Sequence, residues 1–348
     1  MAMLADLVEL VIGVDTHKET HTAAVVVAAT GAMVEQLTVP ATPAGYQRLL
    51  QLMARHQGER VWAIESTGGY GAGLTRFLHA HAEQVVELDR PKRTARRHGA
   101  KSDPLDATRA AREALSRDQL AQPRASGHRL ALSVRLAARR SAVQATGDAQ
   151  RQLHALVVAA PDPLRARLRS LTTPRLVRCC GRLRQRADWD TETIATTASL
   201  RALARRIQLL DAEIAEHTRA ITALVRAWRP DLLTRTGVGP IVAAIVPCAW
   251  SHPGRCPSDA AFAMLGGAAP IPASSGQTVR VRLNRAGDRQ LNQALHLVVL
   301  TRLRYDPATR AYAQRRRTQG KTNREIRRCL VRYVARQLYR LLETQPRL

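Results

Sequence analysis

Four acidic residues lie where the backbone would fix the direction of their side chains. Asp15 ends an apolar run that reads VIGVD, and Glu65 ends another that reads VWAIE. Asp103 and Asp106 follow in the stretch KSDPLDA, three positions apart, so both face one side if a helix begins there. Mg²⁺ prefers oxygen ligands, and two-metal phosphoryl transfer needs several carboxylates that converge. The four acids therefore predict a two-metal Mg²⁺ site, with Mn²⁺ as a substitute.

A structural role for these acids stays open on the residues alone. Asp103 is also suited to cap a helix that has Pro104 in its first turn, and Asp106 would then oppose the helix dipole. His17, two residues after Asp15, is either an orienting residue or an ordinary loop histidine. The placement of all four acids at expected strand ends and an expected helix start favours the metal site.

The region around the acids alternates short apolar runs with turn residues, which predicts a mixed α/β sheet. We expect strands over 8–14, 22–27, 33–39, 60–65 and 84–88, and helices over 42–56, 70–80 and 103–115. In the last of these helices, the residues expected to face inward are Leu105, Ala110, Ala111 and Leu115.

The chain beyond this region becomes helical and rich in arginine. We expect one helix over 130–158 and, after a polar stretch at 188–197, a second over 199–228. Apolar residues of the second helix recur in steps of three and four with a gap at His217, a heptad pattern. The two helices predict an antiparallel coiled-coil arm, although two helices of an ordinary bundle would show a similar pattern. The predicted domains are residues 1–125, 126–228 and 229–348.

The last third of the chain contains a turn and a loop with candidate functional residues. Gly237 and Gly239 in TGVGP are typical of a helix–hairpin–helix turn whose N–H groups approach a phosphate, or of a plain helix–turn–helix corner. The segment from Pro270 to Gly276 is expected to be a loop. The candidate nucleic-acid contacts near these elements are Arg280, Arg282, Arg285, Arg289, Arg316 and Lys321.

The charge of the chain favours a polyanionic partner. Its 348 residues include 54 Lys and Arg against 28 Asp and Glu, a formal net charge of +26. A GC-rich genome would also enrich arginine. The five cysteines lack the spacing of a zinc site or a disulfide framework, so we expect reduced thiols in a cytoplasmic protein. No apolar run approaches the roughly 20 residues of a membrane span, and we expect no membrane partner.

Six motifs taken together resemble one known family. VIGVDTHK, AIESTGGYG and KSDPLDA resemble the RuvC-like DEDD domain of insertion-sequence transposases, the bridge-RNA-guided recombinases. TGVGP, LGGAAPIPASSG and RLNRAGDR resemble the serine-bearing transposase domain of the same family. The resemblance implies an RNase H-like (RuvC-like) mixed-sheet domain over about 8–120, a coiled-coil arm and a mainly helical C-terminal domain.

The same resemblance implies a mechanism. Asp15, Glu65, Asp103 and Asp106 would bind the metal, and Ser275, or the adjacent Ser274, would be the nucleophile. A homo-oligomer, dimer or tetramer, would form composite sites on donor and target DNA, guided by a structured noncoding bridge RNA in a bacterial cytoplasm. Two alternatives stay open: a RuvC-like nuclease that hydrolyses DNA with water, and a non-catalytic basic protein that binds nucleic acid.

Overall fold

The computed structural model describes residues 4–88, 103–117, 120–273, 281–284 and 287–344. The chain separates into two compact units, which we call the sheet unit (residues 1–125) and the helical unit (residues 126–348). Their boundary falls at the end of the first predicted domain. The further division of the helical unit into an arm and a C-terminal domain stays a prediction.

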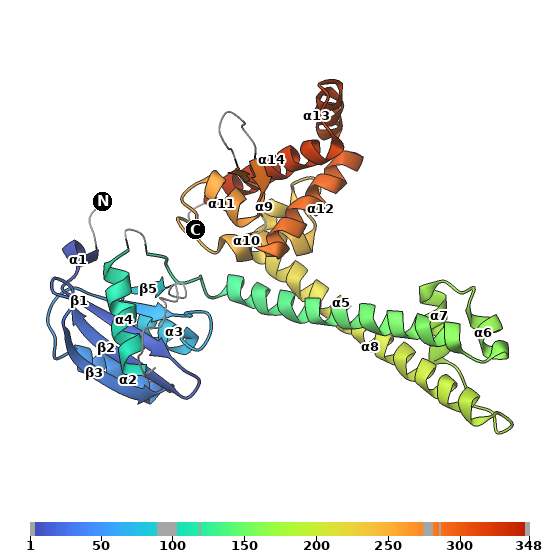
Figure 1. The fold of residues 1–348 in the computed structure, drawn as a ribbon, viewed down its shortest axis with the longest axis horizontal. Coiled ribbons are helices and arrows are strands. Elements are labelled where there is room, and N and C mark those ends of the chain that lie inside the picture. The colour runs from blue at the N-terminus through green and yellow to red at the C-terminus, as the bar shows by residue number, and fades with distance from the viewer. Residues whose placement is uncertain (1–3, 89–102, 118–119, 274–280, 285–286, 345–348) are drawn as a thin grey trace. The chain divides into compact units, whose positions relative to one another are not determined.

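The sheet unit is built on a five-stranded mixed sheet in the order β3-β2-β1-β4-β5 (Figure 1). A meander of antiparallel neighbours forms one half, and parallel strands with helical crossovers form the other. The strands are β1 (Leu10–Thr16), β2 (Thr20–Val27), β3 (Met33–Pro40), β4 (Arg60–Glu65) and β5 (Val85–Leu88). This arrangement is the RNase H-like fold, as predicted.

The central strands β1 and β4 are apolar because helices cover both faces of the sheet. On one face, Ile12, Trp62 and Ile64 share a core with α2 (Pro43–Met53) and α3 (Ala72–Ala80). On the other face, alternate residues of the same strands form a second core with α4 (Asp103–Leu115). A short helix, α1 (Leu4–Leu7), precedes β1.

Helix α4 lies unusually close to β1, and Gly13 makes this possible. A Cβ atom at Gly13 would lie 2.0 Å from the carbonyl oxygen of Ala107 and 2.5 Å from the backbone nitrogen of Ala111. The prediction that Leu105 faces inward is wrong, because that side chain is 49% exposed. The face of α4 that packs on the sheet is made by small residues, namely Ala107, Ala110, Ala111 and Ala114.

Two long antiparallel helices, α5 (His128–Ala159) and α8 (Thr191–Trp228), lie side by side in the helical unit (Figure 1). Two short helices between them, α6 (Asp162–Leu168) and α7 (Thr173–Gly181), close a core at the far end of the pair. Helix α8 begins eight residues before the predicted start, because the Asp190 side chain caps it by accepting a bond from the Thr193 N–H.

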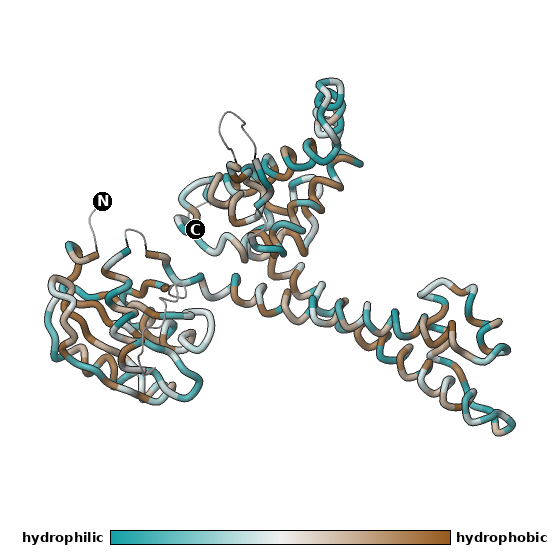
Figure 2. The backbone as a smooth tube through the Cα atoms, viewed as in Figure 1, coloured by the Kyte–Doolittle hydropathy of each residue, from teal (hydrophilic) through white to brown (hydrophobic). Residues whose placement is uncertain are grey.

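The remaining helices form a second core at the other end of this pair. They are α9 (Pro230–Leu233), α10 (Pro240–Trp250), α11 (Asp259–Leu265), α12 (Arg289–Tyr305), α13 (Pro307–Thr318) and α14 (Asn323–Glu343). Helix α13, which is largely hydrophilic (Figure 2), was not predicted as a separate element. The predicted loop at 270–276 begins instead as a strand, since β6 (Pro270–Pro272) pairs with β7 (Val281–Leu283).

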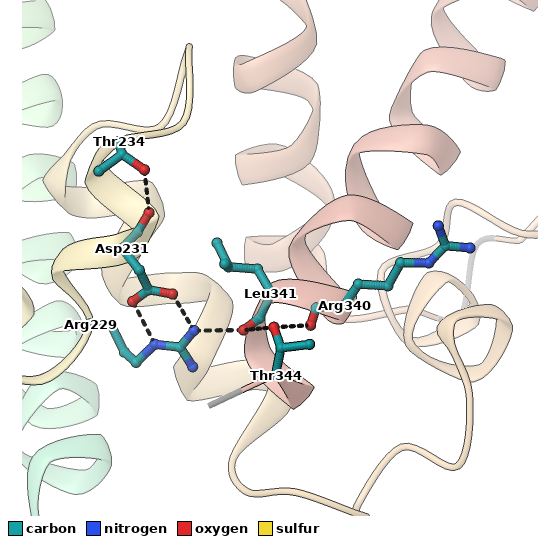
Figure 3. Close-up of polar contacts among 6 residues, drawn as sticks. All are labelled: Arg229, Asp231, Thr234, Arg340, Leu341 and Thr344. Atoms are coloured by element: carbon teal, nitrogen blue, oxygen red, sulfur yellow. Dashed lines mark hydrogen bonds and ion pairs between the residues drawn. The ribbon is translucent and has the colours of Figure 1, made fainter. Parts of the chain in front are cut away.

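A buried arginine ties the end of α8 to α14 (Figure 3). The Arg229 guanidinium donates to the carboxylate of Asp231 at 2.8 and 2.5 Å and to the carbonyl oxygen of Leu341 at 3.0 Å. These bonds satisfy most of its donors, as burial of a charged group requires. Within the described part of the chain, no helix combines the length and apolarity that crossing a membrane requires.

Candidate active site

The ends of β1 and β4 bring Asp15 and Glu65 together. The two strands are parallel neighbours, and Val14 is the partner of Ile64, so the two acids occupy the next position on each strand. Adjacent strands lie about 4.8 Å apart, and residues at matching positions point to the same face. Two residues separated in sequence by about fifty positions therefore lie side by side.

The alternation of side chains decides which face of the sheet the acids share. Ile12 and Val14 pack in the core beneath α2 and α3, whereas Val11 packs in the core beneath α4. Continuing this alternation by one residue directs Asp15 toward the α4 face. The same alternation in β4 directs Glu65 toward that face.

The direction of α4 brings its first turn to the same edge of the sheet. Near the end of α4, the Arg112 Nε donates to the carbonyl oxygen of Gly31, in the turn after β2. Since Val27, the last residue of β2, pairs with Leu10, this turn lies at the beginning of β1. The opposite end of α4, which carries Asp103 and Asp106, must then lie toward the end of β1.

The geometry of the four acids is described only in part. Asp106 is partly buried and accepts a bond from Arg109 at 3.0 Å. The backbone of Asp103 begins α4, but its side chain lies outside the described residues. Among the side chains that are described, no three His, Cys, Asp or Glu groups lie close enough to hold a metal ion. Carboxylate oxygens, which lie at this edge, are the kind of ligand that a hard divalent ion prefers. Metal binding by all four acids stays a prediction.

His17 lies beside Asp15 in the turn between β1 and β2. Its Nδ1 is 3.6 Å from a carboxylate oxygen of Asp15, and its backbone N–H donates to the carbonyl oxygen of Thr20. The Asp15 side chain is 17% exposed and that of His17 is 46% exposed. The arrangement suits a histidine that orients the carboxylate while remaining open to solvent.

The turn after Glu65 is held in an uncommon backbone conformation. Ser66 has a φ of +54°, and its carbonyl oxygen accepts the N–H of Gly69 at 2.7 Å. The Thr16 hydroxyl donates to the carbonyl oxygen of Glu65 at 3.2 Å, which joins the ends of β1 and β4. A non-glycine residue with positive φ costs about 1–3 kcal/mol and is common at functional sites. The sequence does not reveal this strain.

The candidate serines belong to the segment that connects β6 to β7. Ser274, Ser275, Arg280 and Arg285 lie outside the described residues. The hairpin that carries this segment is described, and its innermost pair is Pro272 with Val281.

The other predicted nucleic-acid contacts differ in their surroundings. Gly237 has a φ of +83°, and a Cβ there would lie 3.0 Å from the carbonyl oxygen of Val298 on α12, so this glycine is needed for packing. A Cβ at Gly239 would meet nothing within 4 Å. Arg282 on β7 and Arg289 at the start of α12 are exposed, as is Lys321 before α14. Arg316 donates to the side chain of Gln319 at 2.7 Å.

Comparison with protein families gives two matches that follow one another along the chain. Residues 12–160 match the DEDD transposase domain of IS110, described as a transposase. Residues 230–314 match a domain described as transposase IS116/IS110/IS902 family. The first match contains all four acids, and the second contains the β6–β7 hairpin.

Two curated relatives carry the names of insertion elements. An "insertion element IS900 uncharacterized 42 kDa protein" of Mycobacterium paratuberculosis is 29% identical over 336 residues, covering 82% of this chain and 83% of the relative. An "insertion element IS110 uncharacterized 43.6 kDa protein" of Streptomyces coelicolor is 29% identical over 189 residues, covering 51% of this chain and 47% of the relative.

Proposed function

The chain belongs to the IS110/IS116/IS902 transposase family, and we propose on that basis that it recombines DNA through a serine-linked intermediate. Membership makes it a DNA transposase, and a DEDD domain of the RNase H-like type generally works with divalent metal ions. The proposal adds that the ion is Mg²⁺, held by Asp15, Glu65, Asp103 and Asp106, and that the nucleophile is Ser275.

One observation supports the metal site above the others. Parallel pairing of β1 with β4 places Asp15 beside Glu65 on the face that α4 covers, and α4 begins with the other two acids. A single acid at a strand end or helix start has ordinary structural roles. Three elements that direct acids to one edge of a sheet are better explained by a shared ligand.

The proposed first step exchanges one phosphate ester for another. The hydroxyl oxygen of Ser275 attacks the phosphorus of the scissile phosphodiester and loses its proton. The bond from phosphorus to the leaving sugar oxygen breaks, and that oxygen takes up a proton. The phosphoserine conserves the ester, so the hydroxyl of another strand can reverse the step without an external energy source.

The acids and the basic residues have separate tasks in this step. Bound Mg²⁺ would supply the positive charge that stabilises the phosphate and the leaving oxygen. The acids hold that charge at a fixed position, because two of them end paired strands. Arg282 and Arg289, which both follow the serine segment in sequence, are proposed to orient the phosphate.

The proposal also includes the assembly in which the protein works. Donor and target DNA, a structured noncoding bridge RNA and a homo-oligomer with composite sites are expected in the bacterial cytoplasm. The large net charge of +26 supports polyanionic partners of this kind. Sequencing the RNA that copurifies with the protein tests the guide, since a generic RNA-binding protein would retain no discrete structured species.

A covalent trapping assay tests the chemistry. Asp15→Asn and Glu65→Gln should each reduce strand cleavage by on the order of 10³-fold, because each removes one ligand of the charge-stabilising ion. Ser275→Ala should abolish the protein–DNA adduct. Glu19→Gln is the matched acid control, since Glu19 is exposed in the turn after β1 and is expected to leave cleavage within about twofold.

The same assay separates the alternatives. An adduct that survives Ser275→Ala but is lost in Ser274→Ala would move the nucleophile by one residue. Cleavage by the unmodified protein without any adduct would indicate hydrolysis by water. Full recombination by the Asp15 variant would remove that residue from the mechanism.

A further inference from the structure

A cavity of about 440 Å³ lies in the helical unit at the base of the β6–β7 hairpin. Its walls come from the segment before β6, from β7, from α12, from the end of α13 and from the first half of α14. A volume in this range is typical of sites for small molecules or single chemical units of a polymer.

We call the apolar residues that line the cavity its floor and the charged residues its wall. Most of the exposed surface of the cavity is contributed by carbon, and the floor residues are Ala268, Ala269, Pro270, Ile326, Cys329 and Val331. Among the described residues that line it, none is Phe, Tyr or Trp, and the one aromatic ring is the imidazole of His296. A flat apolar group would therefore be held mainly by contact with aliphatic side chains.

The wall of the cavity is strongly basic. It includes five positively charged side chains and one acid, Glu325, whose carboxylate lies 3.9 Å from the Nζ of Lys321. One carboxylate cannot neutralise five cations, so the site retains excess positive charge. The five are Arg282, Arg316, Lys321, Arg328 and Arg332.

The apolar and basic residues of the cavity together favour a ligand that has both an apolar part and negative charge. A free phosphate would need the cations and not the floor, whereas an apolar ligand would need the floor and not the cations. A nucleotide has both a weakly polar base and charged phosphates on either side. Asn292 and His296, which also line the cavity, add an amide and an imidazole that are able to form hydrogen bonds with a base.

We propose that this cavity binds one unstacked nucleotide of a DNA strand, next to the hairpin that carries the candidate serine. The inference rests on the proposed function in taking DNA as the substrate. Removing one nucleotide from the base stack would mark the position of the strand relative to the hairpin. The cavity then determines which nucleotide of the strand lies beside the hairpin, and the arginines around it increase the affinity for DNA.

Binding of bulged DNA by the full-length protein in EDTA tests this proposal without cleavage. The probes are a DNA duplex with one unpaired nucleotide, the same duplex with an abasic residue at that position, and the fully paired duplex. We expect the unmodified protein to bind the bulged probe about tenfold more tightly than the abasic one, a difference of about 1.4 kcal/mol, because the abasic probe lacks the apolar surface that the base would bury.

Two variants separate the contribution of the apolar floor to DNA binding from that of the basic wall. Ala268→Leu fills the floor and should remove the preference for the bulged base while leaving the salt dependence of binding unchanged. Arg328→Ala should weaken binding of all three probes and lower the slope of log K against log salt by about 0.9. Arg324→Ala is the matched control, since Arg324 is an exposed arginine of the same helix that does not line the cavity.

The thiol of Cys329 provides a direct measure of occupancy. Alkylation of this partly buried lining cysteine should slow at least several-fold when the bulged DNA is bound, whereas Cys179 on α7 should react at an unchanged rate. Equal affinity for the bulged and abasic probes, or unprotected Cys329, would overturn the proposal. Protection by bulged RNA but not by bulged DNA would also overturn it and assign the cavity to RNA.

These readouts are independent of the covalent chemistry. If Ser275→Ala still forms an adduct, the proposed nucleophile fails while binding of the bulged probe is unaffected. If the cavity binds no nucleotide, adduct formation by Ser275 can still be observed.

Discussion

The two units of the molecule differ sharply in charge. Residues 1–125 contain 15 Lys and Arg and 14 Asp and Glu, a net charge of +1, whereas residues 126–348 contain 39 and 14, a net charge of +25. The sheet unit, which carries the four candidate metal ligands, is almost neutral. Nearly all of the excess positive charge lies in the helical unit.

Metal binding and DNA binding have requirements that conflict when they share one surface. The difference in charge between the two units separates them. A carboxylate that must hold a metal ion is weakened as a ligand by a neighbouring arginine, which occupies its oxygens, as Arg229 does to Asp231. A surface that must attract a phosphate backbone needs many such arginines. Placing the acids in a nearly neutral unit reduces this conflict, although Asp106 still accepts a bond from Arg109.

Gly13→Ala is expected to have the largest effect. It tests directly whether metal binding by the sheet unit is separate from DNA binding by the helical unit. The added Cβ would lie 2.0 Å from the carbonyl oxygen of Ala107, so α4 must move away from β1 and take Asp103 and Asp106 with it. We expect a loss of about 3 kcal/mol in the free energy of unfolding, measured by urea denaturation, and loss of strand cleavage. Affinity for DNA should change little, because the binding charge lies in the helical unit.

Gly68→Ala is the control for this experiment. Gly68 lies in the turn after Glu65, and a Cβ there would meet nothing within 4 Å. It should leave stability within about 0.5 kcal/mol. Equal stability and full cleavage in the Gly13 variant would show that the position of α4 does not matter for the acids.

Arg229→Met is expected to have a smaller effect and tests whether this arginine belongs to the fold rather than to the binding surface. The change removes the bonds to Asp231 and to the carbonyl oxygen of Leu341, so unfolding free energy should fall by about 2 kcal/mol. DNA affinity measured well below the melting temperature should stay within about twofold. A loss of affinity without a loss of stability would place Arg229 in the binding surface.

The pH dependence of this variant follows from Asp231. Burial acts to raise the pKa of Asp231, but the hydrogen bond and the charge of Arg229 outweigh it, and the pKa is lowered. The stability that this pair contributes is therefore present above the unfolded pKa of about 3.9 and is lost as the pH falls through the folded pKa. The stability difference between the unmodified protein and Arg229→Met should be constant from about pH 5 to 7 and shrink below about pH 4.

The smallest predicted effect concerns single exposed arginines in the two units. Arg315→Gln or Arg317→Gln on α13 should lower the slope of log K against log salt by up to about 0.9 each if that residue contacts a phosphate. Arg48→Gln on α2, in the sheet unit, should leave the slope unchanged. Equal slopes for all three variants would contradict the assignment of binding to the helical unit.

Much of the sheet unit could be predicted from the sequence because its patterns are local. The strand containing Glu65 was predicted over 60–65, where β4 is found. The prediction that Leu105 faces inward was wrong because the buried face of α4 is made of alanines. Their small side chains fit the close approach of α4 to Gly13. An apolar side chain on a helix does not reveal how near the partner backbone will come.

The acids of the candidate site, whose role stays a prediction, could be selected from the sequence, whereas the elements that hold them in place could not. The apolar runs that end at Asp15 and Glu65 are visible in the sequence, and the family motifs add Asp103 and Asp106. Contacts between distant segments determine the direction of α4, the strained backbone of Ser66 and the cavity beside β7. Such contacts leave no periodic pattern in one sequence.

The first residue of α5 and the last residue of α8 lie next to each other. The rings of His128, at the first residue of α5, and Trp228, at the last residue of α8, stack with their centroids 6.0 Å apart. The 99 residues between them thus form an excursion whose first and last residues are in contact. Removing matched blocks of seven residues from both helices is therefore expected to shorten this excursion while leaving the contact between His128 and Trp228 intact.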